Sequence, residues 1–267
     1  MLKRIISAII LCAVFAPVLV ACRNTTPPED VTVTTEPALT DAPTEPVTEP
    51  ATDPVTEPVT EEPARVLNVV CVGDSITEGV GSSNKSAYSY PSQLQKLLGD
   101  GYKVVNCGKS KATALGSYSK YWNTNGIYYN TTTQYKAALA ASPDIVLIML
   151  GTNDAKHVTG SITESVDQFY AALKELGETF ANLESKPKVY IMASPYRYED
   201  NVRKANMDSA IIPTHKKLAE DMGWGYIDLF TVTKNALKTK NIYSDKLHFN
   251  DDGYAVLAEA IKAALTK

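Results

Sequence analysis

Four short motifs hold the side chains of this sequence that could carry out covalent chemistry. They read Gly73-Asp74-Ser75-Ile76-Thr77, Asn106-Cys107-Gly108-Lys109-Ser110, Gly151-Thr152-Asn153-Asp154 and Asp245-Lys246-Leu247-His248. A serine hydroxyl becomes a good nucleophile when a neighbouring base takes its proton, and histidine suits that role because its charge changes near neutral pH. A nearby carboxylate can accept the other ring N–H, fix the tautomer and stabilise the imidazolium. We therefore predict that Ser75 is a nucleophile, His248 its base and Asp245 the residue that orients the base.

These motifs follow or adjoin segments whose patterns predict alternating strands and helices. The predicted strands are Val66–Val72, Tyr102–Cys107, Asp144–Leu150, Lys188–Ala193 and Gly225–Leu229. The predicted helices are Pro91–Leu98, Thr133–Ala140, Ile162–Leu183, Asn201–Met222 and Asp251–Leu265. Three of the strands are rich in Val and Ile without clean alternation, as expected for strands buried on both faces. The order predicts an α/β fold with a parallel sheet between helices, and ligands bind beyond the carboxyl ends of such strands.

The set of motifs resembles the SGNH/GDSL hydrolases, a family named for catalytic Ser, Gly, Asn and His residues in four blocks. The resemblance covers residues 66–267. It implies a three-layer α/β/α sandwich with a flavodoxin-like five-stranded parallel sheet, and a serine esterase that needs no cofactor. It also implies an oxyanion hole built from the backbone N–H groups of Ser75 and Gly108 and the side-chain amide of Asn153. In the second block, Lys111 stands where the family pattern Asn-x-Gly-x-Ser-Gly has its final glycine.

Each of these residues also has an ordinary structural explanation. Ser75 could be the N-cap of a helix, Gly108 a simple turn and Asn153 the start of a loop. Asp245 and His248 could be surface residues before the last helix. A motif counts most when its structural context agrees, and four motifs in order at one predicted sheet edge favour the catalytic interpretation.

The remaining histidines and cysteines predict neither a metal site nor a disulfide framework. We expect His157 on the rim of the site and His215 exposed on a lysine-rich helix. Cys71 and Cys107 lie in apolar runs, so buried thiols are expected rather than a bridge. Three scattered histidines without paired cysteines argue against a metal site. The sequence contains no phosphate-binding glycine loop, so no nucleotide is expected.

The N-terminal residues 1–21 have the pattern of a bacterial lipoprotein signal peptide. Two basic residues precede an apolar run over residues 5–20, which ends in Leu19-Val20-Ala21-Cys22 and resembles a lipobox. Cleavage before Cys22 and acylation of this cysteine would anchor an exported protein at the bacterial cell surface. An ordinary signal peptide with a chance cysteine is the alternative.

Composition separates an acidic linker, residues 22–64 with Cys22 at its start, from a domain over residues 65–267. Residues 23–64 contain nine prolines, 11 threonines, no glycine and no aromatic residue, and one arginine against ten acidic residues. Repeated Thr-Glu-Pro-Val units predict a disordered, extended tether. The domain has 23 basic and 20 acidic residues. Because it is nearly neutral, a nucleic-acid partner is disfavoured.

Aromatic residues near the predicted ligand edge suggest the substrate. They are Tyr118, Tyr121, Trp122, Tyr128 and Tyr129 after the second motif, and Tyr196 and Tyr198 after the fourth predicted strand. Aromatic faces with polar rims suit sugar rings, although tyrosines can equally pack a loop onto the core. We expect acetyl or other short-chain esters on polysaccharide. Lipase or lysophospholipase activity, acyl transfer to a glycan hydroxyl and a non-catalytic surface binding module are the alternatives.

Overall fold

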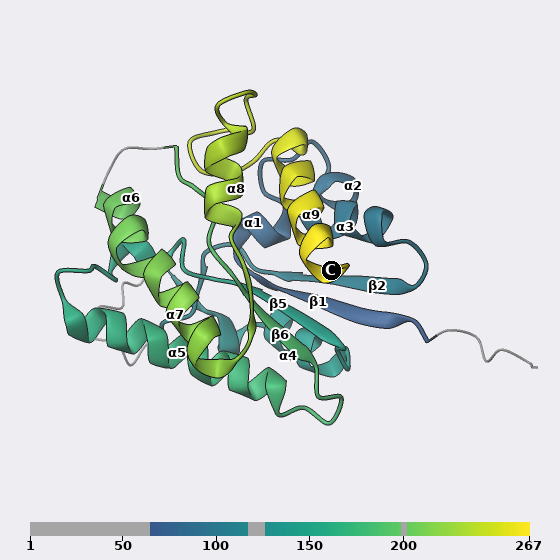
Figure 1. Cartoon of the computed structure of the whole chain (residues 1–267), viewed down its shortest axis with the longest axis horizontal. Helices are drawn as coiled ribbons and strands as arrows, with labels where there is room; N and C mark the ends of the chain where they lie inside the picture. The colour runs from purple at the N-terminus through teal and green to yellow at the C-terminus, as the bar shows by residue number, and fades with distance from the viewer. Residues whose placement is uncertain (1–64, 117–125, 199–201) are drawn as a thin grey trace, which may run out of the picture. The chain divides into compact units, whose positions relative to one another are not determined.

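The computed structural model describes residues 65–116, 126–198 and 202–267 (Figure 1). The chain divides into two compact units, Met1–Pro58 and Val59–Lys267, and all described residues belong to the second. The predicted signal peptide, Cys22 and the linker lie outside the described residues. None of the helices described is long and apolar enough to cross a membrane.

A five-stranded parallel sheet forms the centre of the second unit, as predicted. Its strands are β1 (Leu67–Gly73), β2 (Tyr102–Gly108), β5 (Ile145–Met149), β6 (Lys188–Met192) and β7 (Gly225–Ile227). They pair in the order β2-β1-β5-β6-β7. In this register Gly73, at the end of β1, lies beside Gly108 on one side and Met149 on the other. The loops that carry the first three motifs therefore leave the sheet at one edge.

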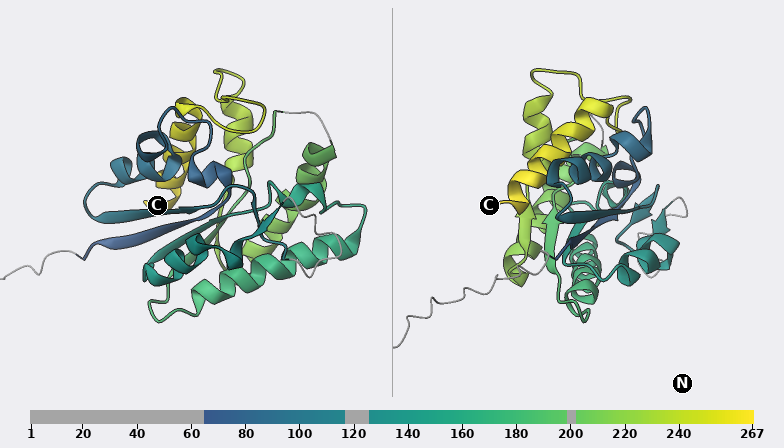
Figure 2. Two further views of the ribbon diagram at one scale, coloured as in Figure 1. Left: turned by 180° about the vertical axis from the view of Figure 1, so that it is seen from behind. Right: turned by 90° about the vertical axis from the view of Figure 1, so that its right-hand side faces the viewer.

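Helices cover both faces of the sheet, which confirms the three-layer α/β/α sandwich (Figures 1 and 2). One face packs against α3 (Tyr90–Leu98), α8 (Leu229–Ala236) and α9 (Asp251–Leu265). The other face packs against α4 (Thr133–Ala140), α5 (Thr163–Ala181) and α7 (Ile212–Met222). Successive β1 residues alternate between the two apolar clusters, because neighbouring side chains of a strand point to opposite faces.

The side chains of the two cysteines of the domain face opposite sides of the sheet. Cys71 belongs to the cluster under α3 and α9, and Cys107 to the cluster under α4 and α5. Both are free and buried, as predicted. Burial raises the pKa of the Cys107 thiol to about 11 and that of Cys71 further still, so both thiols stay protonated.

The structure differs from the predicted elements in three places, one of which is α8, an eight-residue helix that was not predicted. The segment predicted as one helix consists of α6 (Val202–Asn206), a π-helical turn (Met207–Ile211) and α7. Pro213 lies in the first turn of α7 and has no N–H to donate, so a regular ladder cannot continue through it. The predicted strand Gly225–Leu229 stops at Ile227, because Asp228 accepts a hydrogen bond from the Thr231 N–H (2.9 Å) and begins α8.

Short elements at the ligand edge were not predicted. They are α1 (Ser75–Glu78), α2 (Lys85–Tyr88), two 3-10 turns (Tyr129–Thr131 and Asp154–Lys156) and the paired strands β3 (Ala112–Thr113) and β4 (Ile127–Tyr128). Each has four residues or fewer, too short for periodicity to show.

Candidate active site

Ser75 lies at a sharp turn between the centre of the sheet and the first helix. β1 ends at Gly73, Asp74 caps α1 by accepting from the Ile76 N–H (2.9 Å), and Ser75 is the first residue of the helix. A side chain at Gly73 would lie 2.0 Å from Thr77 Oγ1, so the turn requires glycine there. Asp74, rather than Ser75, therefore is the N-cap, and the serine hydroxyl is left for another partner.

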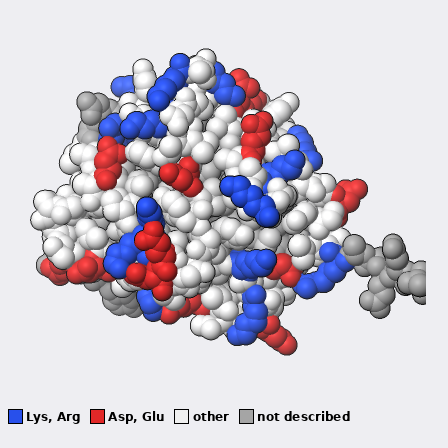
Figure 3. All heavy atoms as spheres, viewed as in Figure 1, with Lys and Arg blue, Asp and Glu red and all other residues white. Residues whose placement is uncertain are grey.

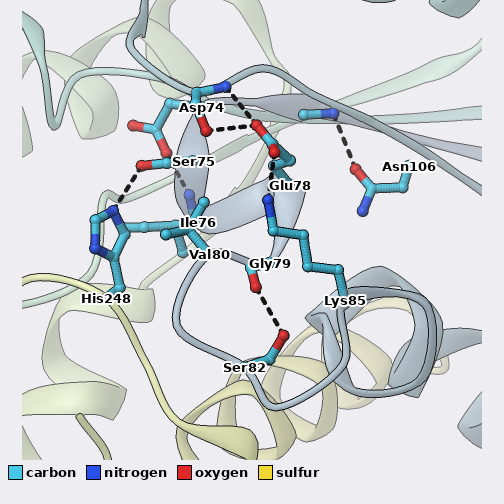
Figure 4. A network of polar contacts seen from close by, with 12 residues as sticks. Asp74, Ser75, Ile76, Glu78, Gly79, Val80, Ser82, Lys85, Asn106 and His248 are labelled. Carbon is cyan, nitrogen blue, oxygen red and sulfur yellow. Dashed lines mark hydrogen bonds and ion pairs between the residues drawn. The ribbon is translucent and has the colours of Figure 1, made fainter. Parts of the chain in front are cut away.

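That partner is His248, in the loop before α9 (Figure 4). Ser75 Oγ lies 3.0 Å from His248 Nε2, and His248 Nδ1 lies 2.8 Å from Asp245 Oδ2. The other carboxylate oxygen of Asp245 accepts from the backbone N–H groups of Leu247 and His248, both at 2.6 Å. Because the carboxylate accepts from Nδ1–H, Nε2 carries the lone pair and accepts from the serine. The structure thus brings together the three residues predicted as nucleophile, base and orienting acid.

The surroundings of Asp245 keep it ionised. Partial burial opposes its charge, but the backbone N–H of His248, the His248 ring and the Leu247 N–H outweigh burial and hold the pKa of the carboxyl below its usual range. Its side chain remains 54% exposed. An ionised Asp245 is the form that can stabilise a protonated imidazole.

Hydrogen bonds hold the His248 loop against the loop after α1. Tyr254 of α9 donates to the Val80 carbonyl (2.6 Å), and Asp251 accepts from the Ser83 N–H (2.8 Å). Residues far apart in sequence are thereby fixed relative to one another, which is what a nucleophile and its base require.

Asn153 joins the second and third motifs. Its Nδ2 donates to the Ala112 carbonyl (3.0 Å) and lies 3.5 Å from Asp74 Oδ2. The next residue, Asp154, is buried and accepts from the backbone N–H groups of Ala114 and Leu115, at 3.2 and 2.9 Å. The Asn153 amide, predicted as an oxyanion donor, therefore lies beside Asp74, the residue that directly precedes Ser75.

Asp74 and Asp154 form a buried acidic pair that the sequence did not predict. Burial raises the pKa of Asp74 to about 7. The hydrogen bond from the Ile76 N–H opposes this rise, and the neighbouring charge of Asp154 adds to it. Burial likewise raises the pKa of Asp154 to about 6. The positive charge of buried Arg197 favours ionisation of Asp74. Buried carboxyls whose pKa is perturbed in this way are common at functional sites.

Gly108 does not have the role that was predicted for it. Its N–H donates to Asn106 Oδ1 (2.9 Å), and a side chain at this position would lie 2.2 Å from the Glu78 backbone nitrogen. Gly108 therefore allows β2 to pack against the end of α1, and its N–H is already engaged.

Lys111 is the better candidate for the third donor. Its φ is +67°, the left-handed conformation that favours glycine, at the position where the family pattern has its final glycine. It directly precedes Ala112, whose carbonyl accepts from Asn153, and no described group accepts from the Lys111 N–H. The sequence already marked this position, because Lys111 stands where the family pattern has its final glycine.

The prediction that His215 is exposed was wrong. The side chain is buried behind the third motif, and its Nε2 lies 2.7 Å from the Leu150 carbonyl. Since a carbonyl can only accept, Nε2 carries the proton. Burial lowers the pKa of His215 to about 4, so the ring is neutral. His157 is half-buried. Its burial and the nearby positive charges of Lys156 and Arg203 lower its pKa.

The predicted sugar-facing aromatic residues divide into different groups. Tyr129 is fully buried and donates to the Cys107 carbonyl (2.7 Å), so it packs its loop onto the core. Tyr128 and Tyr196 are half-buried and Tyr198 is exposed. The predicted positions 118, 121 and 122 lie outside the described residues.

Among the described residues, neither the surface charge nor a cluster of metal-binding side chains marks the site. On the face shown in Figure 3, basic and acidic side chains are interspersed over most of the surface. No group of three His, Cys, Asp or Glu side chains in the described part of the chain could hold a metal ion.

Comparison with known proteins agrees with this geometry. The sequence pattern of the GDSL-like Lipase/Acylhydrolase family matches residues 71–256, which include the site from Asp74 to His248. The chain belongs to this family. It is also similar to an acetylxylan esterase of Xylanibacter ruminicola, with 31% identity over 215 residues, 74% of this chain and 43% of the relative. The chain thus spans less than half the length of that curated relative.

Solved structures of other proteins have the same fold. A catalytic mutant of an acetylxylan esterase from Geobacillus stearothermophilus has a TM-score of 0.58 and 22% identity, covering 77% of this chain and 96% of its own. An alpha/beta hydrolase enzyme from the metagenome of Lake Arreo, Spain, has a TM-score of 0.58 and 22% identity, covering 76% and 96%.

Proposed function

We propose that this protein is a serine esterase that removes acetyl or similarly short acyl groups from carbohydrate. The observation that carries the proposal is the continuous hydrogen-bonded chain from Ser75 through His248 to Asp245. Family membership supports ester hydrolysis, and the acetylxylan esterase relative supports an acetylated glycan as substrate.

In the first half of the reaction, Ser75 Oγ attacks the ester carbonyl while His248 Nε2 takes its proton. A serine–carbonyl bond forms, and negative charge develops on the carbonyl oxygen. The imidazolium then gives its proton to the sugar oxygen, and the C–O bond to the sugar breaks. Asp245 stabilises the imidazolium through the Nδ1 hydrogen bond. In the second half, His248 takes a proton from water, which attacks the acyl-serine. The imidazolium then gives this proton to Ser75 Oγ as the bond between the acyl carbon and the serine oxygen breaks, which releases the acid and free Ser75.

The developing oxyanion needs fixed donors. We assign this role to the Ser75 N–H, the Asn153 side-chain amide and the Lys111 N–H, which takes the place of Gly108. Asn153 is held by the Ala112 carbonyl, immediately after Lys111, so two of the donors share one support. Removal of one such donor typically lowers kcat about 10²–10³-fold.

Hydrolysis of p-nitrophenyl acetate and release of acetate from acetylated xylo-oligosaccharides test the proposal, with the full-length chain beside its Ser75→Ala variant. We expect both activities in the parent and neither in the variant. Cleavage of long-chain esters or lysophospholipids far faster than acetylated sugars would contradict the carbohydrate assignment, and a folded protein without activity would favour a binding module.

We further propose that Cys22 is acylated and anchors the exported protein at the bacterial cell surface. The basic residues, the apolar run and the small residue before Cys22 support this. Incorporation of labelled palmitate into the chain, and its loss in a Cys22→Ala variant, would test it. An unlabelled chain that is secreted in soluble form would indicate an ordinary signal peptide.

A further inference from the structure

A cavity of about 580 Å³ adjoins the catalytic triad at Asp245. The residues that matter for its chemistry are Tyr198, Lys240, Asn241, Ser244, Asp245 and Lys246. They come from the segment after β6 and from the loop between α8 and α9, which also carries His248. Asp245 lines the cavity and is hydrogen-bonded to His248, so a group bound here would be separated from Ser75 by the His248 ring.

One wall of the cavity is an exposed aromatic ring on a fixed support. Tyr198 is 60% exposed, and its ring lies 6.1 Å from that of Tyr243 at 32°. Tyr243 in turn stacks on Phe249 at 4.7 Å, and its hydroxyl donates to the Tyr196 carbonyl. An exposed aromatic face held in place, with polar groups around it, suits the apolar face of a sugar ring.

The charge of the cavity is positive. Between Leu229 and Asn250 the chain contains four lysines and a single acidic residue, Asp245. Lys240 and Lys246 line the cavity, and neither forms an ion pair with a residue that the structure describes. The Asp245 carboxylate already accepts three hydrogen bonds from its own loop. In Figure 3, blue side chains are more numerous than red along the upper edge, above α8.

Polar groups for neutral hydroxyls are also present. Asn241 Oδ1 accepts from the Tyr243 N–H (3.2 Å), and no described group accepts from its Nδ2. Ser244 Oγ donates weakly to the His248 carbonyl (3.3 Å) and can accept from a ligand. The lining thus combines a ring platform, hydroxyl partners and two cations.

We propose that this cavity is a subsite for a uronic acid residue of the acetylated glycan, with the sugar ring on Tyr198 and its carboxylate between Lys240 and Lys246. The inference rests on the proposed function, because it places the uronate across the His248 ring from an acetyl group bound at Ser75. It makes the preferred substrate an acidic rather than a neutral polysaccharide.

A binding measurement tests the subsite without relying on turnover. The full-length Ser75→Ala protein is titrated at low ionic strength with a xylo-oligosaccharide that carries a uronate, and with the same oligosaccharide after reduction of the carboxyl to an alcohol. We expect the acidic ligand to bind about five- to tenfold more tightly, as two partly exposed ion pairs would give. This preference should weaken as salt is added.

Substitutions separate the contributions of the two kinds of residue. Lys240→Gln with Lys246→Gln should reduce the preference to less than twofold. Lys103→Gln with Lys188→Gln removes the same charge near the amino ends of β2 and β6, the end of the sheet opposite the site, and should leave the preference unchanged. Tyr198→Ala should weaken both ligands by a similar factor. Equal affinities for the two ligands, or a preference that survives the first pair of substitutions, would overturn the subsite.

Kinetic measurements distinguish this failure from failure of the proposed function. Without the Ser75 substitution, the Lys240→Gln, Lys246→Gln protein should lose its preference for acidic over reduced oligosaccharides in kcat/KM. The Lys103→Gln, Lys188→Gln protein should keep both this preference and the parent rate with p-nitrophenyl acetate. A parent that binds uronate but releases no acetate would refute the esterase assignment and leave the subsite standing. A parent that deacetylates acidic and reduced oligosaccharides equally would refute the subsite alone.

Discussion

His248 and His215 both lie near the carboxyl edge of the sheet, yet their surroundings give them opposite properties. The His248 ring is reached from both sides: a carboxylate accepts from Nδ1 and a serine hydroxyl lies at Nε2. The His215 ring has one partner, the Leu150 carbonyl at Nε2, and its buried Nδ1 has none among the described residues. A phenylalanine ring, Phe169, packs edge-on against it at 5.7 Å.

The difference teaches that a histidine base needs a carboxylate at the ring nitrogen that does not face the nucleophile. Asp245 can stabilise a proton gained by His248, whereas the Leu150 carbonyl only partly offsets the burial of His215, which lowers its pKa to about 4. His215 instead supports the backbone that leads through Gly151 to Asn153. Under the proposed function, the region around His248 would transfer protons, and the region around His215 would hold the Asn153 amide in place.

The largest effect that separates the two regions is expected from His248→Ala. Without a base for Ser75, kcat for p-nitrophenyl acetate should fall by about four to six orders of magnitude. The unfolding midpoint should change far less than the activity, because the side chain is only partly buried, with 18% of it exposed. An activity within tenfold of the parent would remove His248 from the base role.

Asp245→Asn tests whether the acid makes the difference between the two histidines. The amide cannot stabilise the imidazolium and can hold the ring in the wrong tautomer, so kcat should fall about 10⁴-fold with little change in KM. Steady-state kinetics with the acetylated oligosaccharide would measure this. A change in KM alone would mean that Asp245 binds substrate instead.

His215→Gln should alter the pH dependence of stability. The pKa of His215 is about 4 in the folded state and about 6.5 when unfolded, so the unfolded chain binds more protons between these values. This contribution is fully present above pH 6.5 and is lost as pH falls to about 4, by about 3 kcal/mol in the free energy of unfolding. Urea denaturation at pH 7 and pH 4.5 should show a smaller difference for the variant than for the parent.

The activity of the same variant at pH 7 provides the contrast with His248. The glutamine amide can still donate to the Leu150 carbonyl, so kcat should stay within about tenfold of the parent, well short of the loss of a triad member. A loss comparable to that of His248→Ala, in a folded protein, would break the distinction between the two regions.

Lys111→Gly tests whether the left-handed backbone at Lys111 is strained, and a smaller effect is expected. Because φ is +67°, glycine should relieve strain and raise the free energy of unfolding by about 0.5–1 kcal/mol, with catalysis retained. Lys103→Gly, in the extended backbone of β2, is the matched control and should lower it by about the same amount. Thermal denaturation of both would be informative, and destabilisation by Lys111→Gly would show that the lysine side chain matters.

Deletion of residues 23–64 should have the smallest effect. Both regions lie within the domain, so kcat and KM for small soluble esters should change less than about twofold, within the scatter of typical surface changes. A large loss would mean that the linker belongs to the site.

Long apolar strands and the helices between them could be predicted from the sequence, because burial on both faces and helical periodicity leave clear patterns. The meeting of Ser75, His248 and Asp245 could be predicted because their residue types and motifs match one chemistry, while their catalytic roles stay a prediction. The burial of His215 could not, since a lysine-rich helix surface is visible in sequence whereas the inward direction of one side chain depends on packing. Gly108 was given the wrong role because a glycine required for close packing looks the same as one required for a donor.

The separation of Ser75 and His248 by 173 residues has a consequence for biogenesis. The nucleophile is synthesised near the start of the domain, but its base precedes the final helix, and α9 must pack against α3 before the two meet. No N-terminal fragment that emerges from a ribosome or a translocation channel can hydrolyse an ester by this route. Under the proposed function, the appearance of activity would mark the moment at which the last helix has docked, and a chromogenic acetate could time the maturation of the chain in living cells.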